Sequence, residues 1–385
     1  MPWSETTPMK ERVKLVAAFS DELFSMTELA ELHGISRKTG YKWVERFEQE
    51  GVEGLKDRSR APKSFPHQTP AQIVEGLLQA RRRHPTWGPK KLVAWLEDRR
   101  SDQAWPAAST AGEILKRHGL VRSRPFRRRV EHPGRSVYQA LHPNDLWTAD
   151  FKGQFRTGDA RYCYPLTVAD CLSRYLLGCQ ALRSSGTQSS KTIFERLFRE
   201  YGLPQAIRTD NGAPFASIAI GRLSALSVWW IRLGILPVLI EPSHPEQNAS
   251  HERMHRTLKA ETARPPQANL AAQQRRFDYF RREYNEQRPH ESLGQKPPAT
   301  VYRPSPRAYP QPLPPLGYPG HFEIRRVGSN GCISWNSRWL HLTQALADQD
   351  VGLEEIRDDV WSIHFGPMLL GRFHQGEVRL RGVHS

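Results

Sequence analysis

The sequence has no uninterrupted apolar run of about 18 residues, so it predicts no transmembrane helix. Its N-terminus, Met-Pro-Trp-Ser-Glu, lacks the basic and apolar segments of a signal peptide, and we therefore expect a cytoplasmic protein. Only four cysteines occur, none in a C-x-x-C pair, which argues against a structural zinc site or a disulfide framework. Walker A, Rossmann glycine and G-x-S-x-G patterns are also absent, so these signatures of nucleotide binding and hydrolysis are missing.

Acidic residues are outnumbered by basic ones. The 385 residues include 56 Lys and Arg against 40 Asp and Glu, which gives a formal net charge of +16 and a pI of about 9.9. This excess favours a polyanionic partner, because each neutralised phosphate releases counterions. A basic protein without such a partner is the alternative, but the arginines cluster, which favours nucleic acid. No basic amphipathic helix with an aromatic face stands out, so we expect no membrane partner.

Residues 1–60 read as a helix-turn-helix domain of three helices. Ser25 can cap a helix over 26–32, Gly34 makes the turn, and a third helix covers 37–50. Tyr41, Val44 and Phe47 are expected to pack inward. The third helix would present basic side chains to DNA, namely Arg37, Lys38, Lys42 and Arg46. A plain three-helix bundle is the alternative, and the cationic third helix argues against it.

A second helical DNA-binding domain is predicted over residues 66–130. It follows a linker rich in Pro and Arg, and Thr69 and Pro70 read as the N-cap and first residue of a helix. Two more helices, over about 87–97 and 109–118, repeat the three-helix plan. A basic connector then follows, and its arginines are predicted to track phosphates, unless they form a solvated tail: Arg122, Arg124, Arg127, Arg128 and Arg129.

The pattern changes to an α/β one in residues 140–303. Three strands are expected over 146–155, 162–168 and 174–182, then strands at 205–210 and 235–240 alternate with helices at 187–201 and 218–233. This order predicts a mixed sheet covered by helices. A Pro-rich linker follows at 304–320, and residues 320–385 hold short alternating runs that predict a small β-barrel. The chain is therefore expected to be multidomain, with all-α, α/β and all-β parts.

Three carboxylates stand out in the α/β part. Alternation places Asp150 on one face of its strand, Asp210 ends a strand at an Asn-Gly turn, and Glu252 lies one turn into a helix. Three carboxylates within a few Å repel one another by about 4 kcal/mol per close pair, and a divalent metal converts that cost into binding. Oxygen ligands favour Mg²⁺ or Mn²⁺, and two such ions can drive phosphodiester chemistry.

Three motifs resemble the integrase catalytic core of bacterial insertion-sequence transposases of the DDE, retroviral integrase-like type. They are Trp147-Thr-Ala-Asp150, Thr209-Asp-Asn-Gly212 and Pro245-Glu-Gln-Asn-Ala-Ser-His-Glu-Arg-Met-His-Arg-Thr-Leu-Lys259, and the resemblance covers roughly residues 10–300. It implies a ribonuclease H-like core with a catalytic, metal-binding triad of Asp150, Asp210 and Glu252. It further implies Mg²⁺-dependent cleavage at element ends, strand transfer into target DNA, assembly as a homo-oligomer on paired ends, and association with the nucleoid.

Two features depart from that family. Residues 211–251 separate Asp210 from Glu252, a longer spacing than usual, and Glu246 would match the usual spacing. Glu252 is preferred because helical phase puts it beside three possible phosphate contacts, namely His255, Arg256 and Lys259, whereas Glu246 follows Pro245 in a loop. We attribute the extra residues to a longer helix through Trp229-Trp230. Ala249 stands where the family usually has glycine.

Asn211 has two open interpretations, as a contact to phosphate or as part of the turn. For the whole chain, the leading hypothesis is an insertion-sequence transposase that recognises terminal inverted repeats in double-stranded DNA. The alternative is a DNA-binding regulator, or an inactive relative that retains only helix-turn-helix binding. The intact acids argue against this alternative.

Overall fold

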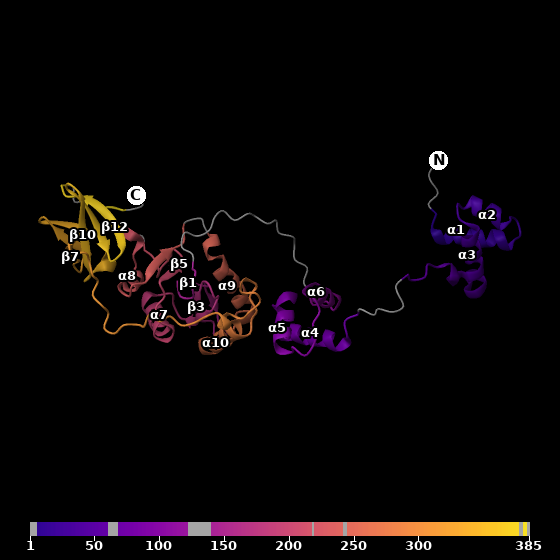
Figure 1. The fold of residues 1–385 in the computed structure, drawn as a ribbon, viewed down its shortest axis with the longest axis horizontal. Coiled ribbons are helices and arrows are strands. Elements are labelled where there is room, and N and C mark those ends of the chain that lie inside the picture. Colours follow the sequence, from indigo (N-terminus) through magenta and orange to yellow (C-terminus); the bar gives the residue numbers. More distant parts are fainter. Residues whose placement is uncertain are drawn as a thin grey trace. The chain divides into compact units, whose positions relative to one another are not determined.

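A computed structural model describes residues 6–60, 68–121, 140–217, 219–241, 245–376 and 380–382 of the chain (Figure 1). The chain forms two compact units, Met1–Gln68 and Thr69–Ser385, and each is considered by itself. Within the described residues, no helix is both long and apolar enough to cross a membrane.

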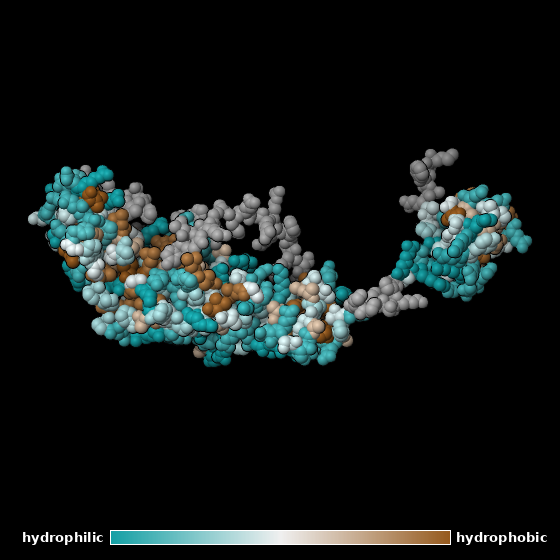
Figure 2. All heavy atoms as spheres, viewed as in Figure 1, coloured by the Kyte–Doolittle hydropathy of each residue, from teal (hydrophilic) through white to brown (hydrophobic). Residues whose placement is uncertain are grey.

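The first unit is a helix-turn-helix bundle of α1 (Pro8–Ser20), α2 (Met26–Leu32) and α3 (Arg37–Glu50). Ser25 and Glu28 form a capping box at α2, so the predicted cap is confirmed. Tyr41 was expected to pack inward but is 54% exposed. Trp43, also on α3, packs in the core instead. Figure 2 shows that hydrophilic residues cover most of the visible face of this unit.

The second unit begins with a further three-helix module of α4 (Ala71–Arg83), α5 (Pro89–Arg99) and α6 (Ala108–Arg117). Pro70, and not Thr69, occupies the N-cap of α4, and no side chain caps it. The module has its own core around the fully buried Leu77 and Leu92, with Trp87 beside them.

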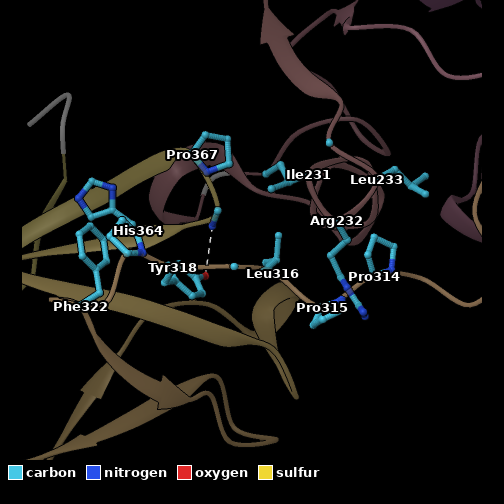
Figure 3. Close-up of a pocket in the computed structure, with 14 residues that line it drawn as sticks. Ile231, Arg232, Leu233, Pro314, Pro315, Leu316, Tyr318, Phe322, His364 and Pro367 are labelled. Carbon is cyan, nitrogen blue, oxygen red and sulfur yellow. Dashed lines mark hydrogen bonds between the residues drawn. The ribbon is translucent and has the colours of Figure 1, made fainter. Parts of the chain in front are cut away.

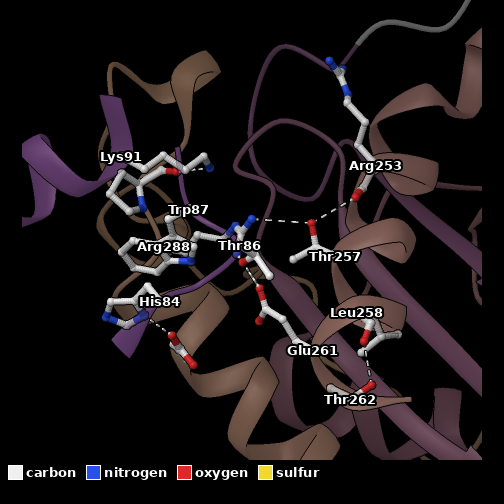
Figure 4. Close-up of polar contacts among 12 residues, drawn as sticks. His84, Thr86, Trp87, Lys91, Arg253, Thr257, Leu258, Glu261, Thr262 and Arg288 are labelled. Carbon is white, nitrogen blue, oxygen red and sulfur yellow. Dashed lines mark hydrogen bonds and ion pairs between the residues drawn. The ribbon is translucent and has the colours of Figure 1, made fainter. Parts of the chain in front are cut away.

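This module docks on the α/β part through polar contacts (Figure 4). The Nδ1 atom of buried His84 lies 2.6 Å from Glu283 Oε1, and Arg288 pairs with Glu261 at 3.0 Å while its guanidinium faces the Trp87 ring. Lys91 donates to the carbonyl of Pro289, and burial lowers the pKa of its ammonium to about 8. Residues 69–121 are therefore held to the α/β part by polar contacts of buried and half-buried side chains.

The α/β part is built on one mixed sheet. Its strands are β1 (Leu146–Phe151), β2 (Phe155–Arg156), β3 (Tyr162–Asp170), β4 (Leu176–Leu182), β5 (Ala206–Thr209) and β6 (Leu236–Leu239). The order is β2-β3-β1-β5-β6, with β4 also paired to β3. β1 runs antiparallel to β3 and parallel to β5, and β5 runs parallel to β6. This confirms the mixed sheet that the alternation of strands and helices predicts.

Helices cover both faces of the sheet. On one face α7 (Thr187–Tyr201) and α8 (Ala225–Arg232) pack against Trp147 and Ala149 of β1. On the other, α9 (Ala249–Thr262) and α10 (Leu270–Glu286) pack against β3 and β4. The helix expected over 218–233 begins only at Ala225, where Ser224 caps it, so the prediction of an elongated helix was wrong. The segment before α8 includes a 3-10 turn at Ile220–Arg222 instead.

The C-terminal part is all-β. A five-stranded antiparallel sheet is ordered β13-β12-β11-β10-β7, and β8 pairs with β9 as a hairpin. The bounds are β7 (Glu323–Arg326), β8 (Cys332–Trp335), β9 (Arg338–His341), β10 (Asp350–Arg357), β11 (Val360–Phe365), β12 (Met368–His374) and β13 (Arg381–Gly382). The pairings among the described residues leave the sheet open, so closure into a barrel stays a prediction.

This β part packs against α8. Val228 and Ile231 share a buried core with the five-stranded sheet. A groove lies beside this contact, between α8, the Pro-rich segment at 314–319 and the β11–β12 turn (Figure 3). Tyr318 fixes the segment, because its hydroxyl accepts the N–H of Gly366 at 3.2 Å and donates to the carbonyl of Asp350 at 2.8 Å.

Candidate active site

Strand register brings Asp150 and Asp210 side by side. Thr148 pairs with Arg208 in the parallel β1–β5 ladder. Two residues further along the chain come Asp150, still on β1, and Asp210, the first residue after β5. Residues paired across adjacent strands point to the same face of a sheet. On β1 that face is the one covered by α9, because Thr148 contacts His251.

The charges of the three acids act on one another. The pKa of Asp150 rises from 3.8 to about 7, first because burial disfavours its charged form and next because of the charge on Asp210. Glu252 raises it further, while Lys152 lowers it. The electrostatic influence of both other acids on Asp150 indicates that all three lie in one region.

Glu252 lies in the first turn of α9 and is exposed. The backbone of Glu246 falls in the 3-10 turn Pro245–Asn248 that precedes the helix, and its side chain lies outside the described part. Ala249 is the first residue of α9. The helix therefore carries Glu252 and not Glu246, in line with the preference for Glu252 from helical phase, while the choice of ligand stays a prediction.

Arg208 and Asn211, on either side of Asp210, bind the segment that precedes α9. Arg208, only 4% exposed, donates to the carbonyl of Gln247 at 3.0 Å, just before α9. The amide of Asn211 donates to the carbonyl of Ile240 at 2.9 Å, and the Gly212 N–H donates to Asp210 Oδ1 at 3.3 Å. The side chain of Asn211 thus links its turn to the residue after β6, and both interpretations of Asn211 stay predictions. The contribution of Arg208 was missed, because its side chain meets Gln247 only in the folded chain.

His255 requires a correction. It was grouped with Arg256 and Lys259 as a phosphate contact, but it is 2% exposed and faces the sheet. Its Nε2 atom lies 2.6 Å from the Thr167 hydroxyl, and its Nδ1 atom lies 3.5 Å from Asp150 Oδ2. Burial holds the pKa of His255 far below its usual value, so the imidazole is neutral and offers no charge to phosphate.

The other predicted DNA contacts divide into three groups. Arg256 and Lys259 are exposed on α9, as is Arg253, which the motif contains but sequence reasoning did not single out. On α3, the side chains of Arg37, Lys38 and Lys42 are exposed. Arg46 is half-buried, with its guanidinium over the Trp43 ring. Arg127, Arg128 and Arg129, with Arg122 and Arg124, lie outside the described residues.

Family models match the N-terminal helical part and the α/β part of the chain. Integrase core domain models match residues 140–245 and 233–298. A helix-turn-helix domain model matches residues 11–63, and a homeodomain-like domain model matches residues 39–115. The chain therefore combines helix-turn-helix domains with an integrase core, and Asp150, Asp210 and Glu252 all fall within the integrase core matches.

Two relatives of this chain are proteins of insertion elements. The uncharacterized 39.2 kDa protein of insertion element IS476 from Xanthomonas euvesicatoria is 31% identical over 180 residues, 46% of this chain and 50% of that protein. The uncharacterized 31.7 kDa protein of insertion element IS407 from Burkholderia multivorans is 30% identical over 159 residues, 41% of this chain and 54% of that protein. The chain thus spans about half the length of these curated relatives.

Among solved structures, the HTLV-2 integrase catalytic core domain in complex with magnesium is 15% identical with a TM-score of 0.35. The match covers 43% of this chain and 100% of that one.

Proposed function

We propose that this chain, which belongs to the integrase-core family of insertion-element proteins, is a transposase that binds the terminal inverted repeats of its element and catalyses DNA strand cleavage and strand transfer. The observation that supports the proposal is that Asp150 lies on β1, next to the strand that leads to Asp210, and that the charges of both Asp210 and Glu252 act on it. In this proposal the three acids are the catalytic residues.

The donor set fits Mg²⁺. Three carboxylates supply only oxygen ligands, which Mg²⁺ and Mn²⁺ prefer. The raised pKa of Asp150 comes first from its burial and next from the charge on Asp210, and a cation would offset both. Asp150, Asp210 and Glu252 would hold one or two such ions, which supply an activated water or 3′-hydroxyl and stabilise a leaving phosphate oxygen. The chain itself keeps Asp150 partly buried and leaves Asp210 and Glu252 exposed to a substrate.

DNA binding would be divided among several surfaces. The exposed cations of α3 suit a major groove, and Arg256 and Lys259 lie on the helix of Glu252, where they would hold the phosphates next to the reacting one. The arginines at 127–129 would add further phosphate contacts. We expect a homo-oligomer on paired ends, acting on target DNA in the nucleoid, and a small barrel over residues 320–385.

The direct test uses the full chain and a duplex that carries the ends of its own element. With Mg²⁺ the chain is expected to nick the ends and join them to target DNA, and a chelator is expected to stop both reactions. A scrambled end sequence of equal length is the matched control. Specific binding of the ends without any cleavage in Mg²⁺ or Mn²⁺ would contradict the proposal and favour a DNA-binding regulator.

Two substitutions decide which glutamate is the third acid. Glu252→Gln keeps the size of the side chain but removes the charge, so we expect a loss of cleavage of at least about 10²-fold, since several kcal/mol of metal-assisted stabilisation is lost. Glu246→Gln is the matched control and should stay within about twofold of the wild-type rate. Rates on the same end substrate measure both variants, and the reverse result would assign the role to Glu246.

A further inference from the structure

Two buried histidines of α9, His251 and His255, lie close to Asp150. His251 and His255 are each 2% exposed, and their rings meet edge to face with centroids 4.6 Å apart. Among the described residues, one ligand atom from each histidine and one oxygen of Asp150 lie within 4.8 Å of one another. The proposed reaction at the three acids uses neither histidine.

Two threonine hydroxyls complete the cluster. The Oγ1 atom of Thr148 lies 2.7 Å from His251 Nδ1. The Oγ1 atom of Thr167 lies 2.7 Å from His251 Nε2 and 2.6 Å from His255 Nε2. Both hydroxyls also lie within reach of carbonyls, at 3.3 Å from Ala169 O for Thr148 and 3.1 Å from Asp150 O for Thr167.

Two arrangements of protons can be drawn. The first places a proton in every contact between the threonines and the imidazoles, and the second leaves the 2.7 Å contact between Thr167 Oγ1 and His251 Nε2 without one. In the first, hydrogen bonds run in one direction from Thr148 through both imidazoles, and His255 Nδ1 donates to Asp150. In the second, the hydroxyls donate to the two carbonyls and accept from His251 Nδ1 and His255 Nε2. Lone pairs then remain on His251 Nε2 and His255 Nδ1, next to the Asp150 carboxylate. Such a convergence of three lone pairs requires a cation.

The geometry at Asp150 favours the second arrangement. The 3.5 Å between His255 Nδ1 and Asp150 Oδ2 is long for a hydrogen bond. It is close to the roughly 3.4 Å that separates two ligands of a tetrahedral ion with bonds of about 2.1 Å. The hydroxyls would then accept from the outer nitrogens of the imidazoles, which is how metal-bound histidines are usually oriented.

We propose that Asp150, His251 and His255 form a binding site for a transition-metal ion of the zinc class. Two imidazoles and one carboxylate suit Zn²⁺ or Co²⁺ better than Mg²⁺, in contrast to the all-carboxylate set of the three acids. Burial lowers the pKa of His251 to about 3, so the ligand is neutral at pH 7 without competition from a proton. Asp150 belongs to both sets, whereas Asp210 and Glu252 belong only to the other.

The test is direct metal binding to the full chain without DNA. Protein stripped with a chelator is titrated with Co²⁺, and the visible absorption spectrum is recorded. We expect one tightly bound Co²⁺ per chain with the intense absorption of a four-coordinate ion, displaced by Zn²⁺. His251→Asn and His255→Asn should each weaken binding by at least about 100-fold. His341→Asn, the same change at an exposed histidine of β9, should leave binding unchanged.

Further variants separate this site from the proposed catalytic one. Asp210→Asn and Glu252→Gln should keep Co²⁺ binding even if they lose cleavage. Asp150→Asn retains both histidines and nearly the same side-chain volume, so its loss of Co²⁺ binding would not reflect unfolding, which circular dichroism checks. The proposal is overturned if the wild-type chain binds no Co²⁺, if both histidine variants bind it like the wild type, or if Asp210→Asn loses it.

Discussion

Asp210→Asn is expected to abolish end cleavage and strand transfer while the chain still binds its element ends. The substitution removes one negative charge from the three acids, and loss of a metal ligand costs several kcal/mol of transition-state stabilisation, or about 10³-fold in rate or more. Asn keeps a carbonyl oxygen that can accept the Gly212 N–H, as Asp210 Oδ1 does at 3.3 Å. Asp210 is exposed, so the change leaves no unpaired buried group.

Cleavage rates and end-binding affinity measure this effect on the same substrate. Affinity should change by less than about twofold, because the basic helices and not Asp210 would carry most of the contacts to DNA. Asp358→Asn, at an exposed turn between β10 and β11, makes the same chemical change far along the chain and should match the wild type. Wild-type cleavage by Asp210→Asn would rule out the metal-site interpretation.

Strand alternation and order were enough to predict that the strand of Asp150 lies beside the strand that leads to Asp210. The alternation of apolar residues predicted where β1 and β5 lie in the sequence. The change from antiparallel strands to alternating strands and helices predicted that these two strands are neighbours in the sheet. Helix α3 was predicted over its observed range, and in the structure Ser36 caps it and Gly51 ends it. These are local signals, so they can be read from the sequence.

The direction in which α9 faces could not be read from Glu252 alone. Its buried residues follow a helical stripe of His251, Met254, His255, Leu258 and Thr262. That stripe was a usable signal, since two histidines share it with Met254 and Leu258. It was missed because histidine is polar, and because only the packing of α9 on the sheet decides that Thr148 and Thr167 satisfy the two rings.

The start of α8 and the form of the C-terminal part also depend on tertiary contacts. Ile220 and Leu223 pack with the C-terminal core and Phe215 with the core of the sheet, so the apolar residues before α8 did not have to be helical. An apolar periodicity does not distinguish a helix from a buried irregular segment that contacts two cores.

Asp150→Asn is expected to stabilise the metal-free chain at neutral and alkaline pH. The pKa of Asp150 is 3.8 in the reference state and about 7 in the fold, so the unfolded chain releases this proton first. Stability is therefore lost as pH rises from about 4 to about 7, and the loss reaches up to about 4 kcal/mol above pH 7. The neutral amide avoids that loss, and Asp150 is thus a residue that the fold tolerates at a cost in stability.

Urea unfolding of both proteins in a chelator, at pH 5 and pH 8, measures this cost. The stability difference between Asp150→Asn and the wild type should be about 2–3 kcal/mol larger at pH 8, because at pH 5 the wild-type carboxyl is mostly protonated in the fold. Asp98→Asn, at an exposed site of α5, should change stability by less than about 0.5 kcal/mol at either pH. A difference that is the same at both pH values would refute the raised pKa. Added Mg²⁺ should stabilise only the wild type, because the repulsion that destabilises metal-free Asp150 is what a bound cation relieves.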